Sequence, residues 1–488
     1  MARGEAQLDE DGWAEDDEGF WTGFNAINDE NIYEAYVFKP PPGDADAEQA
    51  GDEDSNREDR NDTIQPENPS VVPTGKVPWI LMTSIMTAEV IGNGVLSLPR
   101  AYARLGWIPA QLVLFVLYLI TTHTGMLLFR QRNGQPQCRS YPALFLKIFG
   151  KAAYVYATLL VYLLLFMYSA AGVLVQATAW EAALPGLSLN YWIIIAAGIS
   201  WLVLQIRSMK NVGFLSIVGV ITIFIPIILS IVSIAGMVNS GSFERGEQVL
   251  FGNSFYEAVV AATDIIYAFA GHVVFLELMG QMRSPSHFPR SLYASQTVVL
   301  IVYAAVGSSI YAIAGDADWL TSPFTTSLQD GPVKYIVQAL MIVHIAIGIT
   351  INGNILVRAF QNMIEPGLKE LVAGRTDPGT PARAYDRNDY SIPAVIAWAI
   401  WSAIILALIA LLIFLIPKFE NLIGLTASIA ASQTTLGWPP ILDLYVFARS
   451  RTGAFATWQN MASISDIIVA IFALVAGLTA NIIDLVRA

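Results

Sequence analysis

The chain has 488 residues, of which 55% are hydrophobic and only 14% are charged. Soluble domains carry roughly 25% charged residues, so the composition excludes soluble enzymes, nucleic-acid binders and secreted disulfide scaffolds. The single cysteine, Cys138, offers neither an internal disulfide nor a Cys-based metal site. No metal triad, nucleophile constellation or phosphate loop is visible, so we expect neither an enzyme nor a cofactor.

The net charge of −13 is concentrated at the amino-terminal end. Residues 1–76 carry 21 Asp and Glu against five Lys and Arg, whereas the rest of the chain carries 19 acids and 22 bases. Such a composition predicts a disordered tail, and the absence of a basic stretch followed by an apolar one argues against a signal peptide. Aromatic residues between Trp13 and Phe38 indicate a docking segment for a partner, such as trafficking or ubiquitination machinery, or for the protein's own cytosolic face. The alternative is an unstructured tail with incidental aromatic residues.

Apolar runs of the length that spans a bilayer follow the tail. They predict eleven transmembrane helices, at about 79–98, 105–129, 152–179, 190–208, 212–238, 253–280, 289–314, 333–356, 391–416, 420–447 and 466–487. We divide the chain into the tail (1–76), a ten-helix core (77–447) and a last part (448–488) that holds a cytosolic loop and the eleventh helix.

Lys and Arg residues set the predicted orientation, because cytosolic loops carry an excess of them. With a cytosolic tail, 21 of the 27 basic residues lie inside and six outside. The amino terminus is therefore expected in the cytosol and the carboxy terminus outside.

Two of the predicted helices contain weak points near mid-membrane. The first has Gly92-Asn93-Gly94, and the sixth has Gly271-His272. Close packing through small residues explains either segment alone. The pair favours another explanation, since the segments open two successive five-helix sets (about 79–238 and 253–447) that must have opposite orientations. An inverted repeat with glycine-interrupted helices at matching positions indicates the substrate site of a secondary transporter.

The stretch Thr87–Tyr102, TAEVIGNGVLSLPRAY, resembles the first helix of the amino acid/auxin permease family. The stretch Gly271–Glu277, GHVVFLE, followed by Arg283-Ser284-Pro285, is similar to the sixth helix of that family. The resemblance covers about residues 77–487 and is nearest to the fungal neutral and aromatic amino acid permeases. It implies the leucine-transporter fold and amino acid uptake coupled to a cation gradient, usually of protons. This chain departs from the family in having Leu276 where a proline is frequent, and in having no lysine in the fifth helix.

Two carboxylates are candidates for proton coupling. Glu89 lies one turn before Gly92, and an acid inside a membrane helix is functional by default because a buried charge is expensive. Protonation would remove that charge. A structural acid paired with a neighbouring helix is the alternative. Glu277 lies past the sixth-helix interruption, where helix capping or an ion pair with Arg283 is an equal explanation.

The exposed backbone at the two interruptions is expected to bind an amino acid, since amide groups attract its carboxylate and freed carbonyls its ammonium group. In the fold that the resemblance implies, an aromatic residue before the sixth-helix break, here Phe269, would close over the substrate; plain core packing is the alternative. A third-helix hydroxyl, that of Tyr168 or else of Tyr162 or Tyr154, would reach the substrate carboxylate. The His272 imidazole would relay protons or hydrogen-bond the substrate, unless it is simply a satisfied buried polar group. The predicted substrate-binding residues are Ile91, Gly92, Asn93, Gly94, Tyr168, Phe269, Ala270, Gly271 and His272. Thr350 and Asn352 on the eighth helix are candidate cation ligands, and Asp264, His123 and His344 are further polar residues within spans.

The sequence therefore predicts a multi-pass transporter that imports neutral, aliphatic or aromatic, amino acids with a cation, protons being favoured over sodium. The alternatives are a membrane sensor of amino acids on the same scaffold and a sodium-coupled transporter. A channel is disfavoured because nothing resembles a selectivity filter. The plasma membrane is favoured, with the vacuolar membrane as the alternative.

Overall fold

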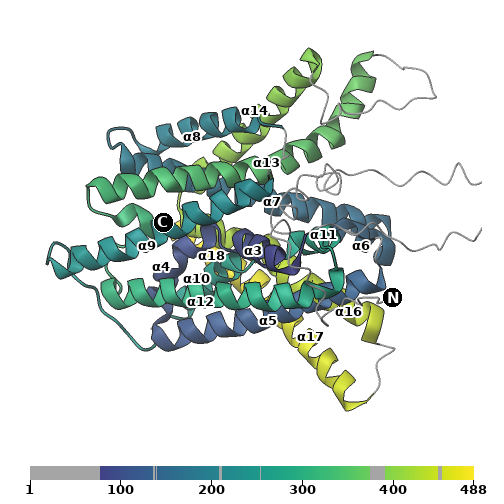
Figure 1. The fold of residues 1–488 in the computed structure, drawn as a ribbon, viewed down its shortest axis with the longest axis horizontal. Coiled ribbons are helices and arrows are strands. Elements are labelled where there is room, and N and C mark those ends of the chain that lie inside the picture. Colours follow the sequence, from purple (N-terminus) through teal and green to yellow (C-terminus); the bar gives the residue numbers. More distant parts are fainter. Residues whose placement is uncertain are drawn as a thin grey trace, which may run out of the picture.

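The computed structural model describes residues 77–135, 138, 140–207, 212–252, 254–373, 391–448 and 453–487, without the side chains of 212–217, 362–373, 454–456 and 487. The acidic tail, including its aromatic segment, lies outside the described residues. Regular structure in the described part is helical (Figure 1). The elements that form the body are α3 (Trp79–Val90), η2 (Asn93–Ser97), α4 (Leu98–Leu105), α5 (Trp107–Gly134), α6 (Tyr141–Phe149), α7 (Lys151–Ala183), α8 (Leu189–Leu204), α9 (Val212–Asn239), α10 (Phe255–Ala268), η3 (His272–Val274), α11 (Phe275–Gln281), α12 (Phe288–Ala314), α13 (Pro332–Ala373), α14 (Ile392–Leu415), α15 (Phe419–Thr426), η6 (Ala427–Gly437), α16 (Trp438–Phe447), α17 (Ala454–Phe472), η8 (Ala473–Gly477) and α18 (Leu478–Arg487).

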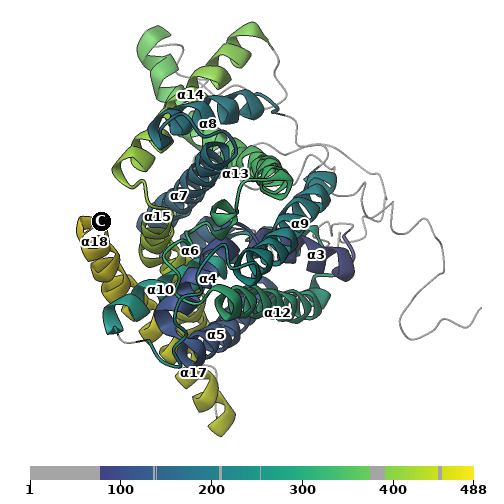
Figure 2. The ribbon, with the colours of Figure 1, turned by 90° about the vertical axis from the view of Figure 1, so that its left-hand side faces the viewer.

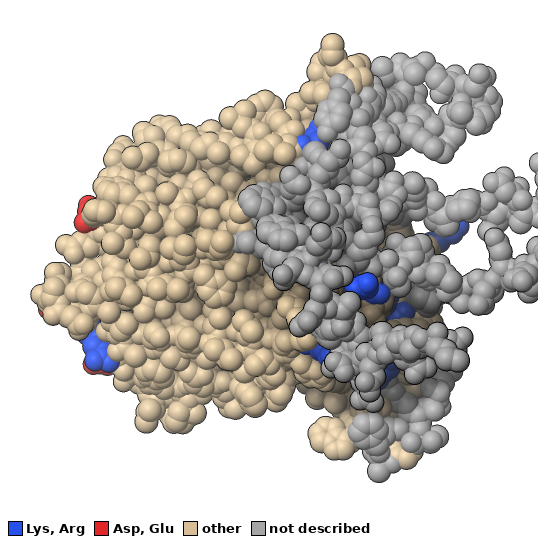
Figure 3. Space-filling model, in the orientation of Figure 1, with Lys and Arg blue, Asp and Glu red and all other residues tan. Residues whose placement is uncertain are grey.

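The body has the surface of a membrane protein. Within the described residues, eight helices are long and apolar enough to cross a bilayer, and nine if the pair Trp79–Val90 and Asn93–Leu105, bent by 47°, counts as one span. The face in Figure 3 has a broad band without charged side chains, and its charges lie toward the two ends. The count of eleven spans stays a prediction, because α8 has only 16 residues and the segment 419–447 is divided by η6.

Three predicted boundaries differ clearly from the observed ones. The first helix does not end near Leu98, because Pro99 occupies the first turn of α4, where its missing N–H costs nothing. The eighth predicted helix continues as α13 to Ala373. The eleventh begins at Ala454 rather than at 466, since Ser463 and Asp466 are buried against protein and not exposed to lipid.

A further helix, α6, lies in the segment expected to be a cytosolic loop. The Ser140 hydroxyl accepts a hydrogen bond from the Ala143 amide at 3.4 Å, which caps the helix start. Phe145 is buried with its ring 4.6 Å from that of Trp438 on α16. This apolar contact explains why a short segment outside the predicted spans is helical.

The helices enclose the two segments where the chain leaves helical geometry. α10 packs against α4, η2, α15 and η6, α12 packs against α3, α4 and α5, and α13 packs against α7 and α9. Viewed from the end in Figure 2, α8 and α14 lie on one side of the body and α17 on the opposite side. The sixth predicted span is an interior element, since 94% of the most apolar part of Phe255–Gln281 is buried inside the protein.

Candidate functional site

The site is built around the ends of α3 and α10. α3 ends at Val90, and helical structure resumes at Asn93, with Ile91 and Gly92 outside it. α10 ends at Ala268, and η3 begins at His272. Both helices end inside the protein, so their last carbonyl groups need partners there or must line a cavity.

Glycines allow the two ends to pack directly on one another. A Cβ atom on Gly94 would lie 2.5 Å from Cα and 2.8 Å from Cβ of Ala268, the last residue of α10. A Cβ atom on Gly271 would lie 2.8 Å from Cγ2 of Val90, the last residue of α3. Each interruption therefore carries a glycine where the end of the other helix approaches.

Tyr303 of α12 joins the same two ends. Its hydroxyl oxygen lies 2.8 Å from the Val90 carbonyl oxygen and 2.7 Å from that of Ala268. A tyrosine carries one hydroxyl proton, so it donates to one carbonyl at a time or shares the proton between them. The side chain is fully buried, and its ring lies 5.3 Å from that of Phe269. Both helix carboxyl ends, which carry partial negative charge, therefore converge on one donor.

A cavity of about 160 Å³ opens beside the interruptions. Cavities of about 150 Å³ accept a molecule of the size of benzene, so this one has room for a small organic substrate. Its walls come from α3, the interruptions, α7, α9 and α13. The residues that line it are Ile85, Ala88, Glu89, Val90, Gly92, Asn93, Gly94, Tyr168, Ser169, Gly172, Gly219, Tyr267, Ala270, His344, Ile345, Ile347, Gly348, Ile349, Ile351 and Asn352.

Glu89 is the one acid among these lining residues, and its side chain keeps accessible surface in the cavity. Glycine and isoleucine residues make up half of the lining residues, and Asn93, Asn352 and the tyrosines contribute polar groups. The cavity thus combines one carboxyl group, exposed backbone and apolar walls.

Tyr168 reaches the second interruption from α7. Its hydroxyl donates to the Ala270 carbonyl oxygen at 2.7 Å, and its ring lies 4.9 Å from that of Tyr267. Of the predicted substrate residues, the cavity brings together Gly92, Asn93, Gly94, Tyr168 and Ala270, and adds Glu89 and Asn352.

The other predicted site residues do not line the cavity. Ile91, Phe269 and Gly271 are buried at the interruptions themselves. The His272 Nε2 atom lies 2.9 Å from the Thr121 carbonyl oxygen, to which it donates, and 3.0 Å from the Thr124 hydroxyl, so the ring faces α5. Glu277 is buried in α11, and the Thr350 hydroxyl donates within its own helix to Ala346 at 2.7 Å.

Most of the lining residues were missing from the predicted site, and Tyr267, His344 and Gly219 are three examples. Tyr267 precedes Phe269 by two residues, and its aromatic character near an interruption was the only signal in the sequence. The His344 Nδ1 atom donates to the Gly219 carbonyl oxygen at 2.9 Å, which links α13 to α9 across the cavity wall. Gly219 has no local signal, because only the packing of α9 on α13 brings it to the cavity.

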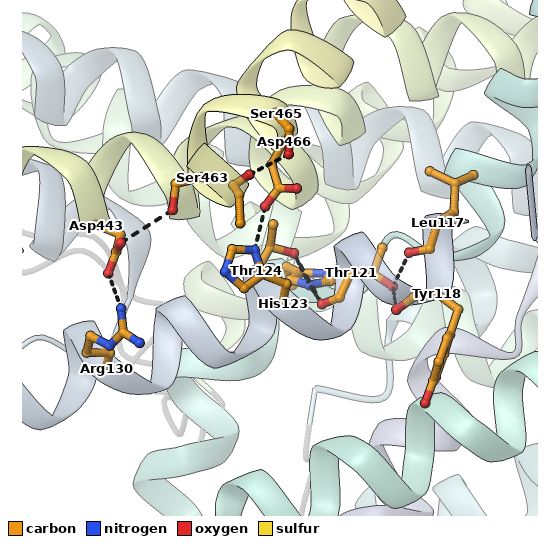
Figure 4. Close-up of polar contacts among 12 residues, drawn as sticks. Leu117, Tyr118, Thr121, His123, Thr124, Arg130, Asp443, Ser463, Ser465 and Asp466 are labelled. Carbon is orange, nitrogen blue, oxygen red and sulfur yellow. Dashed lines mark hydrogen bonds and ion pairs between the residues drawn. The ribbon is translucent and has the colours of Figure 1, made fainter. Parts of the chain in front are cut away.

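His123, another polar residue singled out from the sequence, lies away from the cavity. Figure 4 shows its ring between α5 and α17, where Nδ1 is 2.6 Å from Oδ2 of Asp466. Nearby, Arg130 pairs with Asp443 of α16 at 2.9 Å. These contacts attach the carboxy-terminal helices to the core.

Comparison with known proteins decides the family. The model of the transmembrane amino acid transporter protein family matches residues 76–483. The chain belongs to this family. The match confirms the resemblance seen in Thr87–Tyr102, and it covers the membrane body without the acidic tail.

Individual relatives within the family are distant. The chain is 22% identical to a "Transmembrane transporter" of Gibberella moniliformis over 424 residues, 85% of this chain and 84% of the relative. It is 23% identical to the "N amino acid transport system protein" of Neurospora crassa over 49% of this chain and 53% of the relative. It is 26% identical to "Amino acid transporter AVT1D" of Arabidopsis thaliana over 50% of this chain and 44% of the relative. The last two matches thus span about half of each relative.

Solved transporters resemble the fold more loosely. A Na+-coupled sialic acid symporter matches with a TM-score of 0.44 at 13% identity, over 84% of this chain and 91% of the symporter. A nucleobase-cation-symport-1 family transporter matches with a TM-score of 0.47 at 13% identity, over 86% of this chain and 94% of the transporter.

Proposed function

We propose that this protein is a secondary active transporter that imports neutral amino acids together with protons. The observation that carries the proposal is the cavity at the interruptions, in which one carboxyl group, Glu89, faces exposed backbone and isoleucine-rich walls. Polar backbone suits the ammonium and carboxylate groups of an amino acid, and apolar walls suit a neutral side chain.

Glu89 is the proposed proton carrier. A proton on Glu89 removes a charge from the membrane interior, which costs about 3 kcal/mol or more. A difference of that size is enough to change which access state is favoured, because 1.36 kcal/mol shifts an equilibrium tenfold. Glu277 is the alternative carrier, although it does not line the cavity.

The architecture of the proposal is an eleven-span inverted repeat of the leucine-transporter type, with the amino terminus in the cytosol. Transport at the plasma membrane is favoured over the vacuolar membrane. Sodium coupling, with Asn352 and Thr350 as ligands, is the competing mechanism, and a sensor without net flux is the competing function.

The test is uptake of labelled neutral amino acids into vesicles at several external pH values, with and without sodium. Wild-type uptake should rise as external pH falls and collapse when the proton gradient is dissipated. Glu89→Gln imitates the protonated acid, so it should exchange substrate across the membrane but not concentrate it. Glu277→Gln serves as the comparison and should keep accumulation.

Any of three results would reject the proposal. Concentrative uptake by Glu89→Gln with the wild-type pH dependence would make Glu89 structural. Binding of amino acids by wild type without any net flux would identify a sensor, and a requirement for sodium at every pH would replace the proton.

A further inference from the structure

A second group of charges lies beyond the interruptions, where α10 packs against α4, α15 and α18 (Figure 2). We call it the Arg104 cluster: Arg104 of α4 with Asp264 of α10, Glu420 of α15 and Asp484 of α18. The Arg104 Nη2 atom is 2.5 Å from Oε2 of Glu420, whereas Nη1 is 3.8 Å from Oδ2 of Asp264. Asp484 also interacts electrostatically with the guanidinium group.

Asp264 is the member of this cluster whose carboxylate oxygens lack hydrogen bonds within the described part of the chain. Its side chain is fully buried, and neither carboxylate oxygen has a hydrogen-bond partner among the described residues. Glu420, by contrast, holds the guanidinium group closely. A buried carboxylate that lacks hydrogen bonds is costly in its ionised form.

The charges of the surrounding elements do not balance the cluster. Glu257, on α10 itself, adds a further acid that interacts with Arg104. The nearest other cation of α4, Arg100, is paired with Asp316 at 2.7 Å.

Lys418, at the start of α15, is a further described cation at this end, and its side chain is exposed to solvent. In η2, η6 and η8 no residue is charged. The basic side chains of α5 include His123, which pairs with Asp466, and Arg130, which pairs with Asp443. Asp484 itself receives a hydrogen bond from Tyr256 at 3.1 Å, which disperses its charge but does not neutralise it.

We infer that Asp264 is a proton-binding site of this protein, separate from the cavity and on the other side of the interruptions from Glu89. The proton comes from the aqueous phase at that end and binds a carboxylate oxygen of Asp264. Its binding removes one of the excess negative charges around Arg104, and so stabilises the arrangement in which α4 and α10 lie together.

The position of Asp264 connects this proton to the substrate site. Asp264 lies one helical turn before Ala268, whose carbonyl oxygen contacts Tyr303 and whose Cα faces Gly94. Loss of the proton restores the excess negative charge, which favours separation of α10 from Glu420 and Asp484. This consequence for transport rests on the proposed function, whereas proton binding itself does not.

The direct test uses infrared spectra of the purified full chain in detergent, recorded as differences between acidic and alkaline pH. Wild type should show carbonyl-stretch bands of buried protonated carboxyl groups, that of Glu89 among them, and Asp264→Asn should lack one of these bands, the Asp264 band. Asp316→Asn, which removes an exposed acid of the same end, should keep the Asp264 band, and so should Glu89→Gln. A spectrum of Asp264→Asn with every wild-type band would overturn the inference, because Asp264 would then not change protonation and would simply be paired with Arg104.

A second variant covers the case in which Asp264→Asn does not fold. Glu420→Gln leaves Arg104 free to pair with Asp264, so the Asp264 band should disappear at lower pH than in wild type. An unchanged transition would also overturn the inference.

In uptake assays, the KM of wild type should rise with external pH by up to tenfold per unit for one linked proton. In Asp264→Asn, the slope of log KM against external pH should be lower by up to one, and the variant should still concentrate substrate. Failure of wild type to transport amino acids would reject the proposed function but leave the spectroscopic result standing.

Discussion

At the scale of single residues, the interruptions are held together by contacts that only a few side chains can make. Gly94 faces Ala268, Gly271 faces Val90, and Tyr303 contacts the last carbonyl group of each helix. The structure thereby changes the interpretation of Gly94. Its missing side chain leaves space for α10, in addition to any space that it leaves for a substrate.

Gly92 and Gly94 should consequently respond differently to the same substitution. Gly94→Ala places a Cβ atom against backbone of α10, and we expect a loss of about 1–3 kcal/mol in stability together with loss of uptake. Gly92→Ala meets no atom within 4 Å, so the protein should reach the membrane in normal amount and change only in substrate affinity. Surface abundance and uptake KM of both variants check this, and equal abundance with equal KM would contradict it.

Tyr303→Phe removes the donor shared by two helix ends. A hydrogen bond of this kind contributes about 1 kcal/mol, and an unsatisfied buried carbonyl costs about 1–3 kcal/mol. The two helix ends border the substrate site, so we expect the lost hydrogen bond to weaken the arrangement that binds substrate. A cost of about 1–2 kcal/mol there corresponds to a 5- to 30-fold rise in substrate KM, at similar abundance.

Tyr311→Phe is the matched control for this experiment. Tyr311 lies on the same helix and is also fully buried, but its hydroxyl accepts from the Val249 amide at 2.9 Å, away from the interruptions. Its substitution should lower stability without raising KM. If both variants shift KM alike, Tyr303 has no special role.

At the scale of elements, the carboxy-terminal helix forms part of the core. Asn481 of α18 donates to the Thr263 hydroxyl of α10 at 3.0 Å and to the Ser428 hydroxyl of η6 at 3.4 Å. η6 is a π-helix of eleven residues, most of them small or hydroxylated. α18 therefore ties the sixth-span helix to the tenth predicted span at the level of Asp264.

The contact between α18 and α15 depends on another glycine. A Cβ atom on Gly424 would overlap the side-chain oxygen of Asn481. Gly424→Ala should therefore destabilise the protein, and Asn481→Ala should lose its hydrogen bonds. The double variant should be more stable than the sum of the two effects predicts, with a coupling energy of about 0.5–3 kcal/mol.

Thermal unfolding in detergent, followed for the two single variants, the double variant and wild type, gives the coupling energy. Additive effects would show that Gly424 and Asn481 do not contact each other in the folded protein.

At the scale of the molecule, the acidic tail and the membrane body differ in composition, and the described structure begins at Val77, directly after the tail. Two backbone hydrogen bonds hold Val77, the first described residue, in position. Its amide donates to the Gln281 carbonyl oxygen at 3.1 Å, and its own carbonyl accepts from the Arg283 amide at 2.9 Å. The described membrane body thus begins beside the end of α11, the helix that follows the second interruption.

Deletion of residues 2–60 should preserve this junction. We expect unchanged KM and unchanged proton coupling, with altered surface abundance or turnover, because the tail holds Lys39 and Lys76 as its only lysines for ubiquitin. Pulse-chase turnover and uptake kinetics of the truncated and full chains check this. A truncated protein that is sorted normally but no longer binds substrate would make the tail part of the transport machinery.

The sequence by itself determined the membrane class, the family and the places where two helices are interrupted. Those properties depend on local composition: apolar runs of bilayer length, the Thr87–Tyr102 motif, and glycines near mid-span. It also placed Glu89 beside the first interruption, because the acid and Gly92 are one turn apart on the chain.

Only the tertiary structure decided which residues share the cavity. Tyr267, His344 and Gly219 come from helices whose rotation and depth depend on packing against distant segments, and nothing local marks the side that faces inward. The same reason removed His272 and Phe269 from the cavity, since both lie at the interruption but face α5 and α12. Positions along one helix can be read from the sequence, whereas the meeting of α4, α10, α15 and α18 around Asp264 follows from contacts between residues more than a hundred positions apart.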